Sequence, residues 1–430
     1  MNIAVLLKYK IFHKILKSEF NKNVLILAGG TAVAQAVPVL ISPILTRLYT
    51  PEDFGAFAIF VSITSVISVI SCGRYELAVM LPEKDEDAIN VAAVAFLFNV
   101  FINALFFLFI LFFGDWLLGV LNAKNLGCLM YLAPLSVFLT GTFSILNYTN
   151  NRFKLYKDIS KANVYKALAG AVVQIVMGVL KFGATGLVSG QILSQLASNT
   201  KLFFNIKHLL RNVDKDKLKN MGIRYINFPK YSLWAGLLNT TGYQLVNVLI
   251  GTFYGQTQLG YYYLAFRVLG MPASFIGSSI SQVFYKQAVD EKNKSGNCEI
   301  TFKNTFKKLL IISIPIFVIM FLIVQPIFSI IFGNNWKTSG LYAMILTPMF
   351  AIRFISSVLS IITSIYQKLK LELLINFLLV TFPVILIFQK FEFKLFLIIY
   401  SLVLSIMYFL FLILYYKIPT SITKCDKGGV

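Results

Sequence analysis

The sequence predicts an all-α polytopic membrane protein of about 12 transmembrane helices. We expect these helices to form two parallel-repeat six-helix bundles around a central cationic cleft. Three observations predict this fold: the chain has few charges, it contains hydrophobic stretches long enough to cross a bilayer, and its Lys and Arg residues are unevenly distributed between the connections.

The composition argues against a soluble protein. Hydrophobic residues make up 57% of the 430 residues, and charged residues only 13%. A soluble domain carries roughly 25% charged residues, which it needs to cover its water-facing surface. The 40 Phe residues suit a surface that faces lipid.

Each stretch of about 20 mostly apolar residues predicts one membrane span. In chain order, the predicted spans cover residues 23–46, 55–80, 88–113, 127–149, 159–180, 185–204, 229–252, 259–285, 305–331, 340–363, 372–389 and 394–416.

The distribution of cations predicts the orientation of these spans. Of the 39 Lys and Arg residues, 29 fall in the two termini and the even-numbered connections, and 6 fall in the odd-numbered ones. Lys and Arg accumulate in cytoplasmic loops. We therefore expect a multi-pass membrane protein with both termini in the cytoplasm.

The chain is expected to divide into five segments. They are a basic amphipathic N-terminal segment (1–22), an N-terminal six-helix bundle (23–204), a basic cytoplasmic linker (205–228), a C-terminal six-helix bundle (229–416) and a cytoplasmic tail (417–430). In the first segment, apolar residues recur at helical spacing opposite lysines, which favours a helix on the inner leaflet over a frayed tail. Asp214 and Asp216 interrupt the basic linker, so we expect it to be solvated.

A weak internal repeat supports this division. Tyr49 and Tyr254, which are 205 positions apart, precede the second and eighth spans, and the same offset relates Gly55 to Gly260. Because an even number of spans separates the two halves, they run in the same direction. The repeat is therefore parallel, with its axis along the membrane normal.

Cations within the spans are the candidate binding residues. A charge near the bilayer centre costs about 2.5–3.5 kcal/mol on insertion scales, so it tends to face a cavity or another helix. Arg suits phosphate because its planar guanidinium offers a fork of donors, which makes a pyrophosphate group a natural ligand. The candidates are Arg267, Arg353, Arg74, Lys166 and Arg47.

Each of these cations also has a structural interpretation. Arg267 and Arg353 could belong to structural pairs, and Arg74 and Lys166 could extend towards the membrane surface. For Arg47, an interfacial anchor is the favoured alternative. Glu76 follows Arg74 by two positions, roughly 200° around a helix, so we expect that the two cannot pair on that helix.

Polar side chains on the first, seventh and eighth spans are expected to line the same cleft, although helix packing would explain them equally well. They are Gln35, Asn239, Gln244, Asn247 and Ser274.

The sequence contains no motif of a soluble enzyme. There is no phosphate-binding loop, no serine-nucleophile motif and no zinc-protease motif. The 4 Cys and 2 His residues have no metal-ligand spacing, and the net charge of +21 is explained by cytoplasmic loops without nucleic acid. We expect no catalytic residues, no metal and no cofactor, and leave open the coupling to an ion gradient.

Two segments resemble signatures of a known family. Leu48-Tyr-Thr-Pro-Glu-Asp-Phe-Gly-Ala-Phe-Ala58 resembles the start of the second span in bacterial polysaccharide-transport flippases. Gly260-Tyr-Tyr-Tyr-Leu-Ala-Phe-Arg-Val-Leu-Gly-Met-Pro272, followed by Ile280-Ser-Gln-Val-Phe284, is similar to their second-half motif. These flippases belong to the multidrug/oligosaccharidyl-lipid/polysaccharide exporter superfamily.

The resemblance implies transport rather than catalysis. Such proteins move undecaprenyl-pyrophosphate-linked oligosaccharide repeat units, for O-antigen or similar surface polysaccharides, from the inner to the outer leaflet by alternating access. The implied partners are this lipid-linked oligosaccharide, the bilayer, a polymerase and other polysaccharide-assembly proteins. Alternatives are a multidrug or cation antiporter of the same superfamily, and a membrane-embedded glycosyltransferase or polymerase. The first span lacks the acidic residue typical of the multidrug branch.

Overall fold

The computed structural model describes residues 19–366 and 368–425, and the predicted amphipathic segment lies largely outside this range. Within it, the chain is helical and contains no β-strand. The principal helices are α2 (Glu19–Leu48), α3 (Pro51–Ser71), α4 (Tyr75–Ala78), α5 (Asp85–Val120), α6 (Ala133–Arg152), α7 (Tyr156–Val179), α8 (Ala184–Ile206), α9 (Lys215–Arg224), α10 (Leu233–Tyr254), α11 (Gln256–Pro272), α12 (Ser278–Ser295), α13 (Glu299–Phe332), α14 (Lys337–Leu359), α15 (Ile362–Ile365), α16 (Leu369–Phe388) and α17 (Phe393–Cys425).

The prediction of an all-α polytopic membrane protein is confirmed. Ten helical segments of the described chain are long and apolar enough to cross a membrane. The number twelve is not confirmed by that criterion, although each predicted span forms helix. The two predicted spans outside the ten are α8, of 23 residues, and α10, of 22 residues. Both are long enough to cross about 30 Å of hydrocarbon at 1.5 Å per residue.

The exposed surface of the long helices is strongly apolar. On α5, Phe112 is 74% exposed, and on α13, Leu322 is 69% exposed. Large apolar side chains are favourable at such positions when lipid rather than water surrounds the helix. Phe residues therefore lie on the outside of the protein as well as in its core.

The chain forms two compact units. Unit 1 contains the described residues up to Tyr49 together with Ile59–Gln244. Unit 2 contains Thr50–Ala58 and the described residues from Leu245 onwards. The helices α3 and α10 each contribute to both units.

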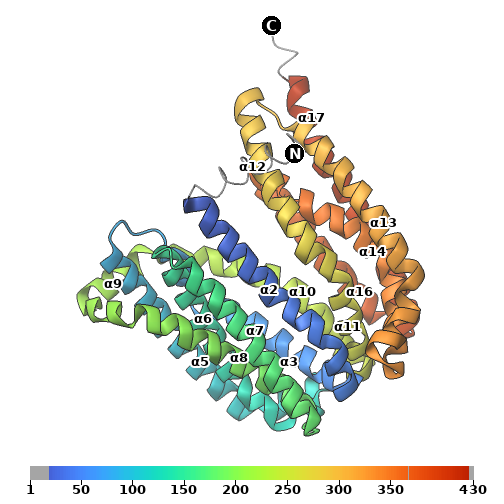
Figure 1. Cartoon of the computed structure of the whole chain (residues 1–430), viewed down its shortest axis with the longest axis horizontal. Helices are drawn as coiled ribbons and strands as arrows, with labels where there is room; N and C mark the ends of the chain where they lie inside the picture. The colour runs from blue at the N-terminus through green and yellow to red at the C-terminus, as the bar shows by residue number, and fades with distance from the viewer. Residues whose placement is uncertain (1–18, 367, 426–430) are drawn as a thin grey trace, which may run out of the picture. The chain divides into compact units, whose positions relative to one another are not determined.

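In unit 1, α2 packs on α7, α7 on α8, α8 on α6 and α6 on α5 (Figure 1). Buried amides join some of these helices. The Asn99 amide of α5 donates to the Phe138 carbonyl at 3.0 Å, and the Asn199 amide of α8 donates to the Leu139 carbonyl at 2.9 Å. Hydrogen bonds of this kind stabilise helix contacts where lipid provides no hydrophobic driving force.

In unit 2, α14 lies at the centre and packs on α11, α13 and α17 (Figure 1). The first turns of α3 cross the first turns of α11 in the same unit. Gly55 lies against the backbone of Gln256, and Gly260 lies against the backbone of Pro51. The two glycines related by the sequence repeat therefore permit one close helix crossing.

Three of the predicted spans are interrupted, one at a glycine and one after a proline. The span expected at 55–80 ends at Ser71, because Gly73 and Arg74 both have positive φ, at 58° and 63°. The span expected at 259–285 contains a π-helical turn at Ala273–Gly277 directly after Pro272, which has no N–H to continue the α-helical bonding. The span expected at 340–363 ends as α14 at Leu359, and α15 follows.

The basic connection at 205–228 contains the amphipathic helix α9, whose Met221 is buried in a cluster with Cys72, Tyr75 and Ile145. The Tyr75 hydroxyl donates to the Gly222 carbonyl at 2.9 Å. This helix packs on α5 because its apolar side can be buried there, while Lys215 and Lys219 are exposed, so the solvated linker stays a prediction.

Candidate functional site

Arg74 occupies a left-handed turn between α3 and α4. Its φ and ψ are 63° and 8°, a conformation that is uncommon for a residue with a Cβ atom. The turn ends the α3 helix and brings the side chain of Arg74 back towards Glu76, with 3.8 Å between a guanidinium nitrogen and a carboxylate oxygen. The expectation that these two residues cannot pair is therefore wrong, because it assumed a continuous helix.

The guanidinium of Arg74 lies against α10 at Gly236. A Cβ atom at Gly236 would lie 3.3 Å from Cζ of Arg74 and 3.4 Å from Nε. Contacts of this length are tighter than the usual separation of about 3.5–4.0 Å between carbon atoms. The absence of a side chain at Gly236 therefore lets the cation approach the helix that carries Asn239 and Gln244.

The polar candidates of unit 1 differ in their surroundings. Gln244 accepts a hydrogen bond from the Ser62 hydroxyl of α3 at 3.0 Å, so it joins α3 to α10. Asn239 and Gln35 are exposed on α10 and α2. Of these three, Gln244 has a demonstrated role in helix packing, which was the alternative interpretation of the polar residues.

The two remaining cations of unit 1 lie apart from the Arg74 turn. Lys166 of α7 places its Nζ 4.3 Å from the ring centroid of Phe143 on α6, a cation–π contact. Arg47 is exposed in the last turn of α2, where a cation interacts favourably with the helix dipole. Neither contact includes a carboxylate.

In unit 2, Arg353 of α14 stacks against aromatic rings. Its Cζ atom lies 5.0 Å from the ring centroid of Phe266 and 5.3 Å from that of Phe350. Phe266 directly precedes Arg267 on α11, so the structure brings Arg353 to the helix that carries the other predicted cation. The flat guanidinium is suited to contacts with aromatic rings.

Arg267 is half-buried on α11, and among the described residues no carboxylate lies within ion-pair distance of it. On the same chain segment, Ser274 is exposed in the π-helical turn and its hydroxyl donates to the Met271 carbonyl at 2.9 Å. Asn247 is half-buried on α10. The described part of the chain contains no cluster of His, Cys, Asp or Glu residues that could hold a metal ion.

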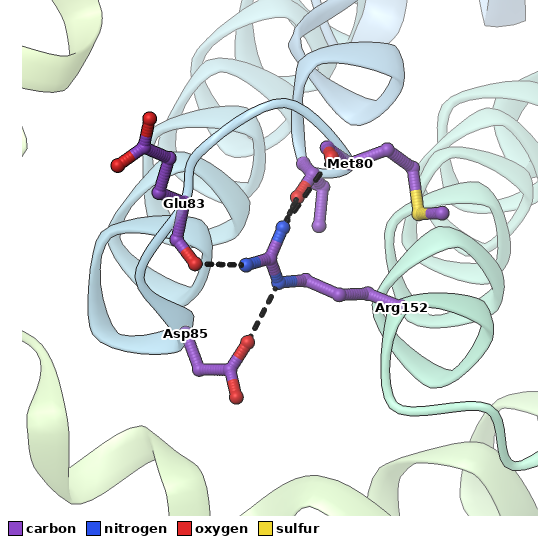
Figure 2. A network of polar contacts seen from close by, with 5 residues as sticks. Met80, Glu83, Asp85 and Arg152 are labelled. Carbon is purple, nitrogen blue, oxygen red and sulfur yellow. Dashed lines mark hydrogen bonds and ion pairs between the residues drawn. The ribbon is translucent and has the colours of Figure 1, made fainter.

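Sequence reasoning missed the role of Arg152, which holds the loop between α4 and α5. Its Nε donates to Asp85 at 3.0 Å, and its terminal nitrogens donate to the backbone carbonyls of Val79, Met80 and Glu83 at 3.3–3.4 Å (Figure 2). The sequence showed Arg152 only as one of many cytoplasmic cations. The position of Arg152 just after the predicted span 127–149 was the signal from which this role could have been inferred.

A second ion pair attaches α9 to this region. Lys217 donates to Glu86 at 2.8 Å, and that hydrogen bond and the carboxylate charge raise the pKa of Lys217. The backbone N–H of Asp214 also donates to the Asn90 side chain at 2.9 Å. The connection between the two halves of the sequence is therefore fastened to unit 1.

Unit 2 has its own set of contacts between α12 and the segment after α15. Lys292 donates to the Ile365 carbonyl at 2.7 Å and lies 4.3 Å from the ring centroid of Tyr366. The Tyr366 hydroxyl accepts a hydrogen bond from the backbone N–H of Cys298 at 3.2 Å. Burial raises the pKa of the Cys298 thiol. These contacts join two connections rather than forming a ligand site.

Comparisons with known proteins bear on the family and the fold. A family described as polysaccharide biosynthesis protein matches residues 44–341. The succinoglycan biosynthesis transport protein ExoT of Rhizobium meliloti is 22% identical over 323 residues, which cover 71% of this chain and 62% of that protein. The teichuronic acid biosynthesis protein TuaB of Bacillus subtilis is 28% identical over 114 residues, or 26% of this chain and 23% of that protein. The chain thus spans less than two thirds of the curated relatives it matches.

Solved structures of flippases and transporters share the fold. The lipid II flippase MurJ in an inward closed conformation matches with a TM-score of 0.71 and 14% identity, over 90% of this chain and 87% of that one. A mutant of the Vibrio cholerae MATE transporter VcmN matches with a TM-score of 0.58 and 13% identity, over 94% and 97%. At these identities the similarity shows the fold alone.

The long apolar helices define a multi-pass membrane protein, and its fold is shared by flippases and transporters of known structure. Because the family match covers more than half of the sequence, the chain belongs to the polysaccharide biosynthesis protein family. The resemblance inferred from the two sequence motifs is confirmed.

Proposed function

We propose that this protein is a flippase for undecaprenyl-pyrophosphate-linked oligosaccharide repeat units, which are assembled into O-antigen of lipopolysaccharide or a similar surface polysaccharide. It moves them from the inner to the outer leaflet of the bacterial cytoplasmic membrane by alternating access. Residues 23–204 and 229–416 act as the two moving bundles, and both termini face the cytoplasm.

The observation that carries the proposal is Arg267. This half-buried cation lies on a membrane helix, without a carboxylate at ion-pair distance among the described residues. An uncompensated charge within a membrane span is costly unless water or an anion accompanies it. Arg353, on the neighbouring helix α14, adds a second guanidinium in the same unit. A pyrophosphate group is the anion whose geometry these donors match.

The physical task also fits a polar route through the membrane. A sugar head group with a charged pyrophosphate cannot cross about 30 Å of hydrocarbon unaided. Cations along a wet path lower that barrier, while the polyprenyl chain stays in lipid. The family and the transport protein among its relatives support polysaccharide cargo.

The test is polysaccharide display in cells whose own copy has been deleted. Arg267→Ala should abolish display while the amount of protein in the membrane is retained. Arg267→Lys should restore part of it, because the charge remains but the bidentate fork is lost. The control is Lys337→Ala, which removes one exposed cation outside the spans' interior and should leave display intact.

Normal display with Arg267→Ala would overturn the assignment of Arg267. If deletion of the protein left surface polysaccharide unchanged and instead made cells sensitive to drugs, the alternative of a multidrug or cation antiporter would hold. The similarity to the VcmN fold is the observation behind that alternative. Against it, the only acidic residue of α2 is Glu19, at its first position.

A further inference from the structure

The turn between α3 and α4 contains an ion pair, Arg74 with Glu76, whose polar atoms are not all hydrogen-bonded. The side chain of Glu76 is 8% exposed and that of Arg74 is 28% exposed. Within the described structure, Oε2 of Glu76 and Nε of Arg74 are buried and have no hydrogen-bond partner. Buried polar atoms are normally satisfied, so a polar pair with one unused donor and one unused acceptor needs an explanation.

The separation of the pair shows how Glu76 acts on Arg74. Charge-assisted hydrogen bonds between nitrogen and oxygen are typically about 2.7–2.9 Å long, whereas these groups are 3.8 Å apart. Glu76 therefore supplies negative charge close to the guanidinium without occupying its donors. The guanidinium retains donors for another anion, and its partial exposure gives that anion access.

The backbone around the pair holds this arrangement in place. The left-handed conformation of Arg74 is unfavourable for a residue with a Cβ atom and persists only where surrounding packing enforces it. Here, the neighbouring Cys72 and Tyr75 are buried in the core of unit 1, and Gly236 leaves room for the guanidinium. The strain therefore positions Arg74 beside both Glu76 and α10.

We propose that Arg74 binds the pyrophosphate group of the cargo and that Glu76 is an internal competing anion that keeps this binding weak enough for release. The inference rests on the proposed function, since the pyrophosphate belongs to the lipid-linked cargo. A transport site must bind well enough to load and weakly enough to unload. A fixed carboxylate beside the cation lowers anion affinity by repulsion, without removing the donors. Glu76 is thus a positioning residue that acts through Arg74.

The experiment measures pyrophosphate binding by the purified full-length protein in lipid nanodiscs, using calorimetry. The probes are inorganic pyrophosphate and geranyl pyrophosphate, a soluble prenyl pyrophosphate. Glu76→Gln keeps the shape but removes the charge, and should tighten the binding of both probes by about two- to fivefold, the scale of one partly exposed charge pair. Arg74→Gln should weaken the binding of both probes several-fold, and the binding that remains is the part assigned to Arg267 and Arg353.

The double variant distinguishes an electrostatic role from a structural one. If Glu76 acts through Arg74, the Arg74→Gln/Glu76→Gln protein should bind no better than Arg74→Gln alone. The matched control is Glu83→Gln, which removes the same charge from an exposed side chain that points away from Arg152 (Figure 2). It should change affinity less than twofold. If Glu76→Gln does not fold, Glu76→Asp, which withdraws the carboxylate, should tighten binding about twofold.

Unchanged or weaker binding in Glu76→Gln would overturn the proposal, as would the lack of any binding by the wild type. Binding of inorganic pyrophosphate without geranyl pyrophosphate would overturn the assignment to lipid-linked cargo, because the site would then take only free anions. Tighter binding in Glu76→Gln together with no lipid transport by the wild type in vesicles would refute the flippase function while the Arg74–Glu76 site stands.

Discussion

The crossing of α3 and α11 makes a quantitative prediction for two glycines. A Cβ atom at Gly55 would lie 2.6 Å from the carbonyl carbon of Gln256, and one at Gly260 would lie 2.7 Å from the carbonyl carbon of Pro51. Carbon atoms normally approach to about 3.5–4.0 Å. The carbonyl oxygens of Gln256 and Pro51 would lie closer still. Since the obstacle is backbone in both cases, Gly55→Ala or Gly260→Ala must push the two helix ends apart by more than about 1 Å.

The expected loss of stability follows from two opposing terms. Overpacking of a tight contact costs about 1–3 kcal/mol, and a contact with rigid backbone belongs at the upper end. Replacing a helical glycine by alanine returns about 1 kcal/mol of helix propensity. Each single substitution should therefore destabilise unit 2 by about 2 kcal/mol, which lowers the melting temperature by roughly 4–8 °C for a unit of this size.

Thermal unfolding of the detergent-purified protein measures this effect. The control is Gly29→Ala, since a Cβ atom at Gly29 of α2 meets nothing within 4 Å. It should leave the melting temperature unchanged or raise it. The double variant Gly55→Ala/Gly260→Ala should cost less than the sum of the singles, because one separation of the helices relieves both clashes. Single variants that melt within 1 °C of the wild type would refute the close crossing.

Three further predictions concern the connections. Arg152→Ala removes the donors that hold the loop at residues 79–85, so limited proteolysis should cleave this loop several-fold faster than in the wild type; equal rates would contradict the role of Arg152. Exposed Cys128 should react with an impermeant maleimide in intact cells, whereas Cys298 should not. In the purified protein, burial raises the pKa of the Cys298 thiol. Alkylation of Cys298 should therefore be slow at neutral pH and should accelerate as the pH increases towards that raised pKa. Rapid alkylation of Cys298 at pH 7 would contradict its burial.

The sequence predicted the helices well because hydrophobic length is a direct signal. Every predicted span corresponds to a helix, since burying about 20 apolar residues in lipid leaves few alternatives to helical hydrogen bonding. Helix ends were less predictable. The end of α3 depends on left-handed conformations at Gly73 and Arg74. A glycine allows such a turn but does not require it, and a left-handed Arg is enforced by packing that the linear sequence does not display.

The sequence predicted which cations belong to the candidate site, but it did not predict which residues they contact. An Arg within an apolar stretch signals an unusual environment, and Arg74, Arg267 and Arg353 were found in that way. The partners that lie far away in the chain are Gly236 beside Arg74 and Phe266 beside Arg353. These are apolar or small residues with no distinguishing signal in a hydrophobic sequence, so only the packed structure reveals the contacts.

The repeat illustrates what a sequence offset can and cannot establish. The spacing of 205 positions made Gly55 and Gly260 equivalent, but equivalent residues in two repeats usually lie apart and have similar, separate surroundings. Here a Cβ atom at Gly260 would lie 3.1 Å from the backbone nitrogen of Gly55, so the two glycines meet each other. A contact between symmetry-related residues requires that both be small, because each limits the approach of the other. The same requirement explains why glycine occurs at this position in both motifs, and it assigns those motifs a packing role that is distinct from any contact with cargo.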